Sequence, residues 1–579
     1  MRFNFAIIGG GLTATAMLCQ FVKKVQEKLA QGQLNPSGVG IQIYEKQDVF
    51  GPGFPHSNRY VLPFHITNMC AADMGILAER PADFQHWVIE NSEKLETQSG
   101  VAVDAAAETG ASRPLCRHYP RAIMGEYLKA RFQEAVLAAR QAGLAVTLYP
   151  AYEVVDLTQK GDRLSLRIRN SASGNYFTRD ADRVLLATGH WCEKNDQNCY
   201  FPSPWPAQRL LDSIPPDAKI AVIGTSLSAI ETLLTLTADG SFVRSASGEL
   251  CYEPSAVSRK FVLYSRSGLL PKVRGKMGNH KNRFLNQENL DRLLSENRGN
   301  LKLKPIFDLL NSELEAAYGH PIDWYEILDP TGEPGDLLQG YISDAVTGDG
   351  PDGELIWQTI LHQSFDMSRD IYLNLTLAER RRFDANYTSV FFTHAATQPV
   401  INAEKLLALI KAGLLEVVKL GKNYQLLQDE ATGHYEFVYK DDRGNFKKDA
   451  YRYVVNARGQ EKSIETDPSA LAHNLIKSKT VLIEEFRSAA CPSQGGDHVW
   501  PCTETAAETY KTGSIWIDPY THLVIQAGSA DRPTKSSTIY AVGAMTRGQI
   551  IDASMARGIV RAASRIAADL VDHLIQTDR

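Results

Sequence analysis

Three small residues near the start of the chain have the spacing of a dinucleotide-binding turn. They form the pattern Gly-x-Gly-x-x-Ala directly after the apolar run FAII. In such a turn the first glycine permits a sharp bend, the second lets a pyrophosphate approach the backbone, and the alanine lets the following helix pack closely on the strand. The N-terminus of that helix then faces the phosphate charge. The pattern predicts a phosphate site at Gly9, Gly11, Leu12, Thr13 and Ala14.

A second apolar strand, residues 41–45, ends in Glu45, and Lys46 follows it. In dinucleotide-binding folds an acidic residue at this point accepts hydrogen bonds from ribose hydroxyls. Glu45 lies farther from the turn than the roughly twenty residues that are usual, because the helix is extended and is followed by the loop GQLNPSGVG. The turn, the helix and the acid-tipped strand together predict a site for the ADP half of FAD.

Residues 219–236 repeat the order of strand, turn and helix. Gly224 matches the first glycine of the turn, but Ser226 stands where the second glycine is expected, and its side chain is expected to crowd a pyrophosphate. The next strand ends without an acid and with Arg266, which suits the 2′-phosphate of NADPH rather than NADH. We therefore predict an NADPH site. A nucleotide fold kept as a scaffold after losing its ligand is the alternative.

Two segments of this kind predict an α/β protein with two Rossmann-like dinucleotide-binding domains, one for FAD and one for NAD(P). In such pairs the second fold often interrupts the first, whose closing strand and helix then come from the C-terminus. Residues 537–543 have the pattern of that strand, and Asp552–Ile575 has helical spacing of apolar residues. The predicted boundaries are 1–215 and 461–579 for the FAD-binding domain, and 216–271 and 386–460 for the NAD(P)-binding-like domain.

Residues 272–385 depart from the nucleotide-fold pattern and are predicted to form a mostly helical insertion. Helical stretches include Asn289–Glu296 and Pro305–Tyr318, and turn-rich sequences interrupt this region. The strand-like YEFVYK and YRYVVNARG then return the chain to a sheet. The polar segment Glu90–Pro114 has neither a helical nor a strand period, which predicts a surface insertion.

The composition is that of a soluble globular protein. Of 579 residues, 44% are hydrophobic and 22% are charged, and the formal net charge is -5. No apolar run approaches the roughly eighteen residues that span a bilayer and no leader pattern opens the chain, so we expect a cytoplasmic protein without a membrane partner. The basic runs KVRGK and RRR lack interleaved aromatic residues, so no nucleic-acid partner is expected. The eight cysteines contain no Cys-x-x-Cys pair, which favours free thiols over a metal site or a redox dithiol.

Further motifs follow one another along the chain: GPGFPHS at 51–57, HITNM at 65–69, RPADFQHW at 80–87, ATGH at 187–190, SRSGLLP at 265–271 and VGAMTRGQIIDAS at 542–554. This set resembles the FAD/NAD(P)-binding flavoprotein family that includes the L-aspartate N-monooxygenases, which form nitrosuccinate. The resemblance covers both nucleotide folds and the C-terminal return.

The resemblance implies roles for residues that spacing alone does not single out. The stretch His65–Met69, which contains Asn68, would lie near the isoalloxazine, and Gly189 would line the cofactor site. Gly543 and Arg547 would close over the pyrophosphate or the flavin edge. We take Asn68 and Arg547 as candidate catalytic residues, because an amide can bond to a flavin ring and a guanidinium fork can bind a substrate carboxylate. An asparagine that only caps backbone is the alternative for Asn68.

Histidines give weaker signals. His56 and His65 are candidates for proton transfer, although a loop histidine is more often solvated or already hydrogen-bonded. His394 stands where relatives tend to carry a histidine followed by basic residues, but alanines follow it here.

Together these features predict a single-component flavin monooxygenase. NADPH would reduce FAD, and the reduced flavin would activate molecular oxygen for transfer to a small-molecule nucleophile. The family resemblance implies that this nucleophile is an amino group, for example that of an amino acid. Because the cofactor performs the difficult step, no catalytic triad or metal set is required. Two alternatives remain: a flavoprotein reductase or dehydrogenase that does not oxygenate, and a non-enzymatic dinucleotide-binding scaffold, which Ser226 and the helical insertion would suit.

Overall fold

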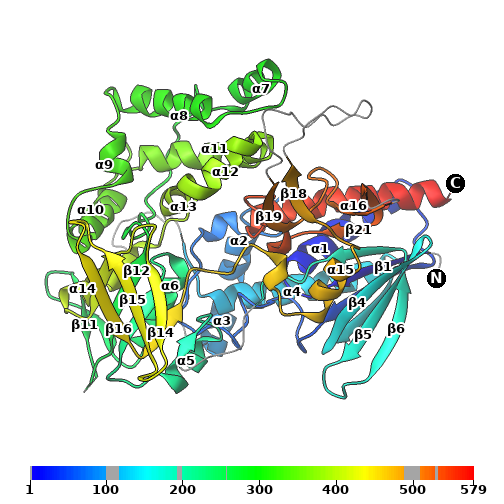
Figure 1. The fold of residues 1–579 in the computed structure, drawn as a ribbon. Helices are drawn as coiled ribbons and strands as arrows, with labels where there is room; N and C mark the ends of the chain where they lie inside the picture. The colour runs from blue at the N-terminus through cyan, green and yellow to red at the C-terminus, as the bar shows by residue number, and fades with distance from the viewer. Residues whose placement is uncertain are drawn as a thin grey trace. The chain divides into compact units, whose positions relative to one another are not determined.

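The computed structural model describes residues 3–99, 117–191, 199–255, 257–487, 509–528 and 532–578. The chain divides into two compact units, and each contains a mainly parallel sheet with helices (Figure 1). Unit 1 consists of Met1–Ser112, Cys116–Cys192 and Glu461–Arg579, and unit 2 of Arg113–Leu115 and Glu193–Gln460. Unit 2 therefore interrupts unit 1 in sequence.

A six-stranded sheet forms the centre of unit 1. Its strands are β1 (Phe3–Ile8), β2 (Val39–Glu45), β3 (Ala145–Pro150), β7 (Arg183–Leu186), β20 (Leu523–Ala527) and β21 (Pro533–Ala541). They lie in the order β20-β21-β7-β1-β2-β3, and all neighbours are parallel except β20 and β21. Every residue of β1 is buried, as expected for the central strand of a sheet covered on both faces.

Three long helices complete the core of unit 1: α1 (Leu12–Ala30), α4 (Arg121–Gln141) and α16 (Ala556–Asp578). Helix α1 packs against both α4 and α16, and its buried stripe includes Met17, Leu18 and Phe21. Shorter helices are η1 (Ala71–Asp73), α2 (Asp83–Glu90), α3 (Ser92–Ser99), η4 (Ile464–Thr466), α15 (Ala470–Lys477) and η6 (Ala544–Thr546). The strand and helix predicted for the C-terminal return are confirmed as β21 and α16.

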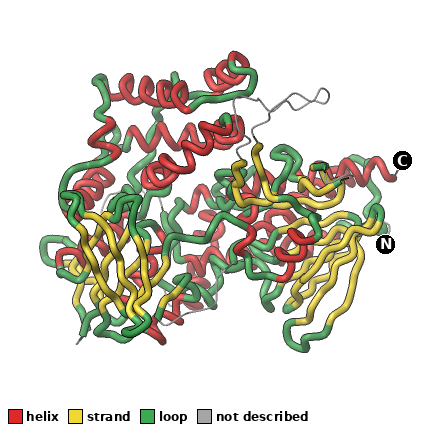
Figure 2. The backbone as a smooth tube through the Cα atoms, in the orientation of Figure 1, coloured by secondary structure: helices red, strands yellow, loops and turns green. Residues whose placement is uncertain are grey.

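Antiparallel strands form the rest of unit 1. One sheet contains β4 (Tyr152–Lys160), β5 (Arg163–Asn170) and β6 (Tyr176–Ala181), and a second contains β18 (Ile483–Arg487) and β19 (Thr509–Ile515). Figure 2 shows β4, β5 and β6 as adjacent yellow strands joined by short loops.

The central sheet of unit 2 has the order β13-β12-β9-β17-β8, with all neighbours parallel. Its strands are β8 (Tyr200–Phe201), β9 (Lys219–Ile223), β12 (Lys260–Ser265), β13 (Leu415–Lys419) and β17 (Tyr453–Asn456), and its helices are α5 (Ala207–Ser213), α6 (Leu227–Leu236) and α14 (Val400–Lys411). Antiparallel sheets comprise β10 (Ser241–Arg244) with β11 (Leu250–Glu253), and β14 (Gln425–Asp429), β15 (His434–Lys440) and β16 (Phe446–Tyr451). Since β8 pairs with β17, the chain joins the second sheet before residue 215, where the sequence analysis places the boundary.

Helices dominate the stretch between β12 and α14. They are α7 (Gln287–Glu296), α8 (Leu303–Tyr318), α9 (Trp324–Leu328), α10 (Pro334–Thr347), α11 (Ile356–Asn374), α12 (Leu377–Arg382), η3 (Phe383–Tyr387, a π-helix) and α13 (Thr388–Ala395). The helices predicted at 289–296 and 305–318 are confirmed as α7 and α8. The helical region also continues past residue 385, because α13 follows η3 without a break.

The segment Glu90–Pro114 differs from its prediction. Residues 92–99 form α3, although no helical period was expected there. The physical reason is that α3 is almost entirely polar and buries Leu95 as its one large apolar side chain, so no apolar stripe marks it in the sequence. Residues 100–116 lie outside the described residues.

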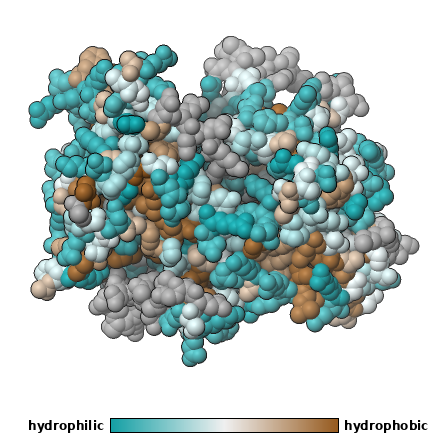
Figure 3. All heavy atoms as spheres, turned by 90° about the horizontal axis from the view of Figure 1, so that it is seen from below, coloured by the Kyte–Doolittle hydropathy of each residue, from teal (hydrophilic) through white to brown (hydrophobic). Residues whose placement is uncertain are grey.

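Large exposed apolar side chains come from different elements, among them Leu137 on α4, Tyr176 on β6, Val346 on α10 and Phe446 on β16. The face in Figure 3 carries mainly hydrophilic residues, with hydrophobic ones in separate groups between them. In the described ranges, no helix has the length and apolarity needed to cross a bilayer.

Candidate functional site

The turn between β1 and α1 tolerates only glycine at its first position. Gly9 has a φ of +107°, and its amide donates to the Tyr44 carbonyl oxygen at 2.8 Å. A Cβ on Gly9 would lie 2.2 Å from the carbonyl oxygen of Ala187. Strands β2 and β7 therefore confine this turn from both sides.

The loop at residues 51–53 gives a second reason why residue 11 must be small. A Cβ on Gly11 would lie 3.2 Å from the Cα of Gly53, and the Gly51 amide donates to the Gly10 carbonyl oxygen at 2.7 Å. The loop GPG at 51–53 thus packs directly on the glycine turn. Two glycines around a proline are the sequence signal for such a close approach, but sequence does not identify the partner.

The first turn of α1 offers free backbone amides to a ligand. Gly11 is the N-cap, no side chain caps the helix, and no acidic residue lies in its first turn. The amides of Leu12, Thr13 and Ala14 therefore retain the donor capacity that favours a phosphate at a helix N-terminus.

Glu45 lies against the turn, as the spacing predicted, but its carboxylate already accepts two backbone hydrogen bonds. Its Oε2 accepts from the Gly10 amide at 2.7 Å and its Oε1 from the Gln47 amide at 2.8 Å. The side chain is buried, and this burial raises the pKa of Glu45. Glu45 thus fixes the turn, and any ribose contact would use its remaining lone pairs. Lys46 is exposed beside it.

The segment after β21 brings Gly543 to the first turn of α1. Gly543 has a φ of +100°, and a Cβ there would lie 3.5 Å from the Thr13 hydroxyl. Arg547 follows after the single turn η6 and is half-buried. Among the described residues, no hydrogen bond or ion pair involves its guanidinium, and burial lowers the pKa of Arg547. A half-buried cation without a counter-ion is suited to an anionic ligand group.

His65, Asn68 and Met69 lie in one loop but in different environments. The His65 side chain is 0% exposed, and its Nδ1 accepts from the Leu62 amide at 3.1 Å, which leaves its imidazole no surface for a cofactor. Met69 packs against the core. The Asn68 side chain is only partly buried, and it forms none of the hydrogen bonds found among the described residues. The backbone-capping alternative for Asn68 therefore has no support in this structure.

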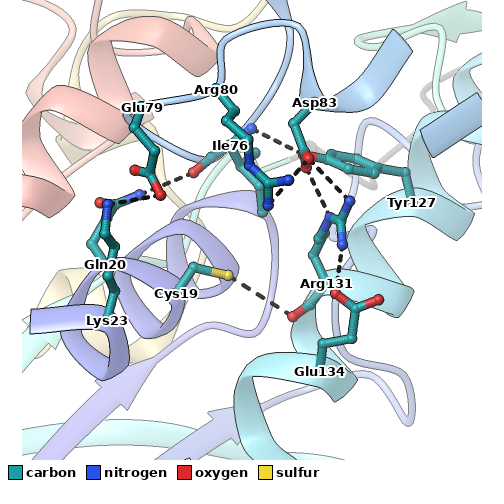
Figure 4. A network of polar contacts seen from close by, with 10 residues as sticks. All are labelled: Cys19, Gln20, Lys23, Ile76, Glu79, Arg80, Asp83, Tyr127, Arg131 and Glu134. Carbon is teal, nitrogen blue, oxygen red and sulfur yellow. Dashed lines mark hydrogen bonds and ion pairs between the residues drawn. The ribbon is translucent and has the colours of Figure 1, made fainter. Parts of the chain in front are cut away.

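The motif RPADFQHW has a structural role. Asp83 accepts both forked bonds of Arg131, from Nε at 2.8 Å and from Nη2 at 3.0 Å, and a third from the Tyr127 hydroxyl at 2.8 Å (Figure 4). The Tyr127 oxygen in turn accepts from the Ile76 amide at 3.1 Å. These bonds attach the first residue of α2 and the loop before it to α4. In the same region, burial raises the pKa of the Cys19 thiol to about 12.

Two further residues border the site from β7 and the GPG loop. Gly189 has a φ of +70°, and a Cβ there would meet nothing within 4 Å, so this backbone is open to a ligand. His56 is buried, and burial, with the charges of Arg121 and His190, lowers its pKa to about 3. His56 is therefore neutral at physiological pH.

Unit 2 repeats the geometry of the first turn. Gly224 has a φ of +119°, its amide donates to the Tyr264 carbonyl oxygen at 2.7 Å, and a Cβ on it would lie 2.9 Å from the Ala457 carbonyl oxygen. Gly224, Tyr264 and Ala457 correspond one for one to the residues that confine the first turn. The repeat predicted from the sequence is thus present in atomic detail.

Ser226 is the N-cap of α6, and its side chain is exposed and makes no capping bond. Its hydroxyl can therefore donate to a phosphate, and the expectation that the side chain only crowds the site is incomplete. Arg266 lies at the end of β12, where its Nη2 donates to the Ser389 hydroxyl at 2.6 Å. Arg266 was predictable from its place after a strand, but Ser389 was not, because it lies 123 residues farther along the chain.

His394 lies on α13, the helix that also carries Ser389. Its Nδ1 bonds to the Val390 carbonyl oxygen at 2.9 Å, its ring packs against Trp357, and burial lowers its pKa. The described residues contain no group of three or more His, Cys, Asp or Glu side chains that could hold a metal ion.

Cys19, Cys199 and Cys251 are free, but Cys70 is disulfide-bonded, so the prediction of free thiols is wrong for Cys70. The cysteines nearest to Cys70 in sequence are Cys19 and Cys116. Because neither is close enough to form a Cys-x-x-Cys motif, the sequence gives no local signal for this disulfide.

Residues 6–191 match a family model whose description is FAD-NAD(P)-binding. This range contains the glycine turn, the GPG loop and Gly189, and the match agrees with the FAD-type fold predicted for unit 1. The α/β fold class with two Rossmann-like folds is confirmed.

Individual proteins are also similar to the chain. The uncharacterized protein YdhS of Escherichia coli (strain K12) is 22% identical over 481 residues, which cover 79% of this chain and 83% of that protein. The solved structure of the reduced form of ornithine hydroxylase from Pseudomonas aeruginosa matches this structure with a TM-score of 0.48 and 13% sequence identity, over 99% of both chains. The ornithine N-hydroxylase of Kutzneria sp. 744 matches with a TM-score of 0.46 and 12% identity, also over 99% of both chains.

Proposed function

We propose that the protein is an FAD-dependent oxidoreductase that uses NADPH, with FAD in unit 1 and NADPH in unit 2. The observation that carries this proposal is the glycine turn of unit 1, where uncapped amides of α1 lie beside Gly543 and the loop of Arg547, which has no counter-ion among the described residues. A diphosphate with a flavin at its far end supplies the negative charge and the hydrogen-bond acceptors that these groups lack. The equivalent turn in unit 2 supports a second dinucleotide.

The reaction we propose is single-component monooxygenation, which rests on the motifs shared with the aspartate N-monooxygenase family. Bound FAD supplies hydride acceptance from NADPH and activation of molecular oxygen. The amides at the α1 N-terminus and the segment 543–547 would hold the diphosphate of FAD, and Asn68, whose amide forms none of the hydrogen bonds found among the described residues, would contact the flavin or the oxygen. Arg547 balances negative charge at the flavin edge or on a substrate carboxylate.

The acceptor we propose is the amino group of an amino acid or another amine, with aspartate as one hypothesis. An amine attacks only as the neutral base, so the substrate pocket must exclude water and remove a proton.

NADPH oxidation by the purified protein, measured against a panel of amino acids and amines, tests this function. We expect one class of amine to yield a hydroxylated product in proportion to the NADPH consumed. If every amine gives the same rate and all electrons appear as peroxide, the monooxygenase proposal fails and a reductase remains. Tight FAD binding without any reduction by NADPH would instead favour the scaffold.

A further inference from the structure

Two basic side chains meet the helical insertion at the carboxyl edge of the unit 2 sheet. Arg266 follows β12 and Lys422 follows β13, and these strands are parallel neighbours. The loops that carry them are bonded directly, because the Gly421 amide donates to the Arg266 carbonyl oxygen at 3.2 Å. Arg266 and Lys422 therefore lie at the same edge, where dinucleotide-binding folds bind the adenosine ribose.

The insertion contacts both cations with neutral oxygens. Ser389 accepts from Arg266 Nη2 at 2.6 Å, and the Asn386 amide oxygen accepts from Lys422 Nζ at 2.9 Å. Asn386 and Ser389 are three residues apart at the junction of η3 and α13, and this spacing places them on one helix face. A π-helix is rare and frequently marks a functional site.

Carboxylates of the described residues do not balance the charges of Arg266 and Lys422. Neither Arg266 nor Lys422 has an ion-pair partner among the described residues, whereas the neighbouring Lys419 contacts Asp329 at 3.1 Å and Asp442 at 3.4 Å. In the described part of the chain their hydrogen-bond acceptors are a hydroxyl and an amide oxygen, so neither charge is neutralised before an anion binds. Lys419 is thus paired with carboxylates, whereas Arg266 and Lys422 have no such partner among the described residues.

We propose that Arg266, Lys422 and Ser389 together bind the 2′-phosphate of NADPH, so that Ser389 and Lys422 determine the preference for NADPH over NADH. This inference rests on the proposed function of unit 2. A phosphate monoester carries close to two negative charges at neutral pH, which one guanidinium and one ammonium balance. The Ser389 hydroxyl accepts from Arg266 and can donate its own proton to a phosphate oxygen, so the two contacts are compatible.

Calorimetric titration of the purified protein with adenosine 2′,5′-bisphosphate and with 5′-AMP tests the inference. In Ser389→Ala and Lys422→Gln, we expect the affinity for the bisphosphate to fall about tenfold to a hundredfold, the usual effect of a lost hydrogen bond to a charged group. The affinity for 5′-AMP should change less than about twofold, because 5′-AMP lacks the 2′-phosphate. Ser343→Ala on α10 and Lys302→Gln before α8 are matched controls with exposed side chains.

A structural brace between α13 and the sheet would give a different result. It predicts that Ser389→Ala lowers thermal stability and leaves the ratio of the two affinities at its wild-type value, which would overturn the inference. If Ser389→Ala unfolds, Ser389→Thr keeps the hydroxyl and should restore the wild-type ratio. Equal binding of both nucleotides by the wild type would overturn the phosphate site alone. Binding of neither, with no oxidation of NADPH or NADH, would overturn the proposed function of unit 2 as well.

Discussion

Arg547 is the residue on which the proposed chemistry of unit 1 depends most, because it is a half-buried cation without a counter-ion among the described residues. Arg547→Met removes the charge and keeps most of the side-chain volume. We expect a loss of about 1.5–3 kcal/mol in FAD binding, or about tenfold to a hundredfold in Kd, measured by fluorescence quenching of FAD. Arg547→Lys should recover part of this loss. Unchanged Kd and kcat in Arg547→Met would show that the guanidinium contacts neither cofactor nor substrate.

His56 makes a prediction about pH. Its pKa is about 3 in the folded chain and near 6.5 when unfolded, so the unfolded chain binds the additional proton. The stability that follows is fully present above pH 6.5 and is lost as the pH falls towards 3. Between about pH 7 and about pH 5 this contribution should decrease by about 2 kcal/mol. In His56→Asn, urea unfolding at both pH values should show a smaller decrease, and an identical decrease would contradict the neutral, buried histidine.

Sequence spacing predicted which single residues form the phosphate turn, but it did not predict which residues they contact. Gly9, Gly11 and Glu45 lie where the dinucleotide pattern places them. However, the two amides that bond to Glu45 and the contact of Gly11 with Gly53 depend on loops that come together only in three dimensions. His65 is predicted near the flavin, and the structure shows its side chain fully buried and bonded to the Leu62 amide, a local contact that no spacing rule includes.

At the scale of elements, the bonds that join Asp83, the first residue of α2, to α4 lead to a stability prediction. Asp83 is nearly fully buried and is the acceptor for Arg131 and Tyr127. Arg131→Met leaves this carboxylate buried without its main cation, so we expect a loss of about 3–5 kcal/mol in the free energy of unfolding. Lys23→Gln, which removes the exposed pair with Glu79, is the control and should change stability by less than about 1 kcal/mol. Equal losses of stability in the two variants, measured by urea titration, would show that burial of Asp83 does not increase the cost of removing its partner.

Elements with a strong apolar period were predictable, and elements without one were not. Helices α1 and α6, which follow the two glycine turns, carry apolar stripes at helical spacing, and so do α7 and α8. Helix α3 is nearly all polar, and η3 differs from an α-helix only in its hydrogen-bond register, which sequence does not report. The contact of α13 with Arg266 was also not predictable, because it joins residues that are 123 positions apart in the sequence.

For the whole molecule, the order of motifs predicted the interrupted topology. Unit 1 opens the chain and is completed by β21 and α16, and unit 2 lies between these parts in sequence. The second turn repeats the surroundings of the first glycine, with Tyr264 and Ala457 in the places of Tyr44 and Ala187, although Ser226 replaces the second glycine. Local spacing is sufficient to detect this repeat, since both turns impose the same steric limits on their glycines.

The FAD content of the purified protein, in the wild type and in Gly11→Val, tests the phosphate site at the opening of α1 most directly. A valine would clash with Gly53 and cover the amides that face the pyrophosphate, whereas Gly340→Ala on α10 has open space and serves as the control. Absorbance of the flavin per chain, with circular dichroism to verify folding, gives the measurement. We predict yellow wild-type and Gly340→Ala proteins and a colourless but folded Gly11→Val. A folded Gly11→Val with its full complement of FAD, or a wild type that takes up no FAD, would contradict the proposed site.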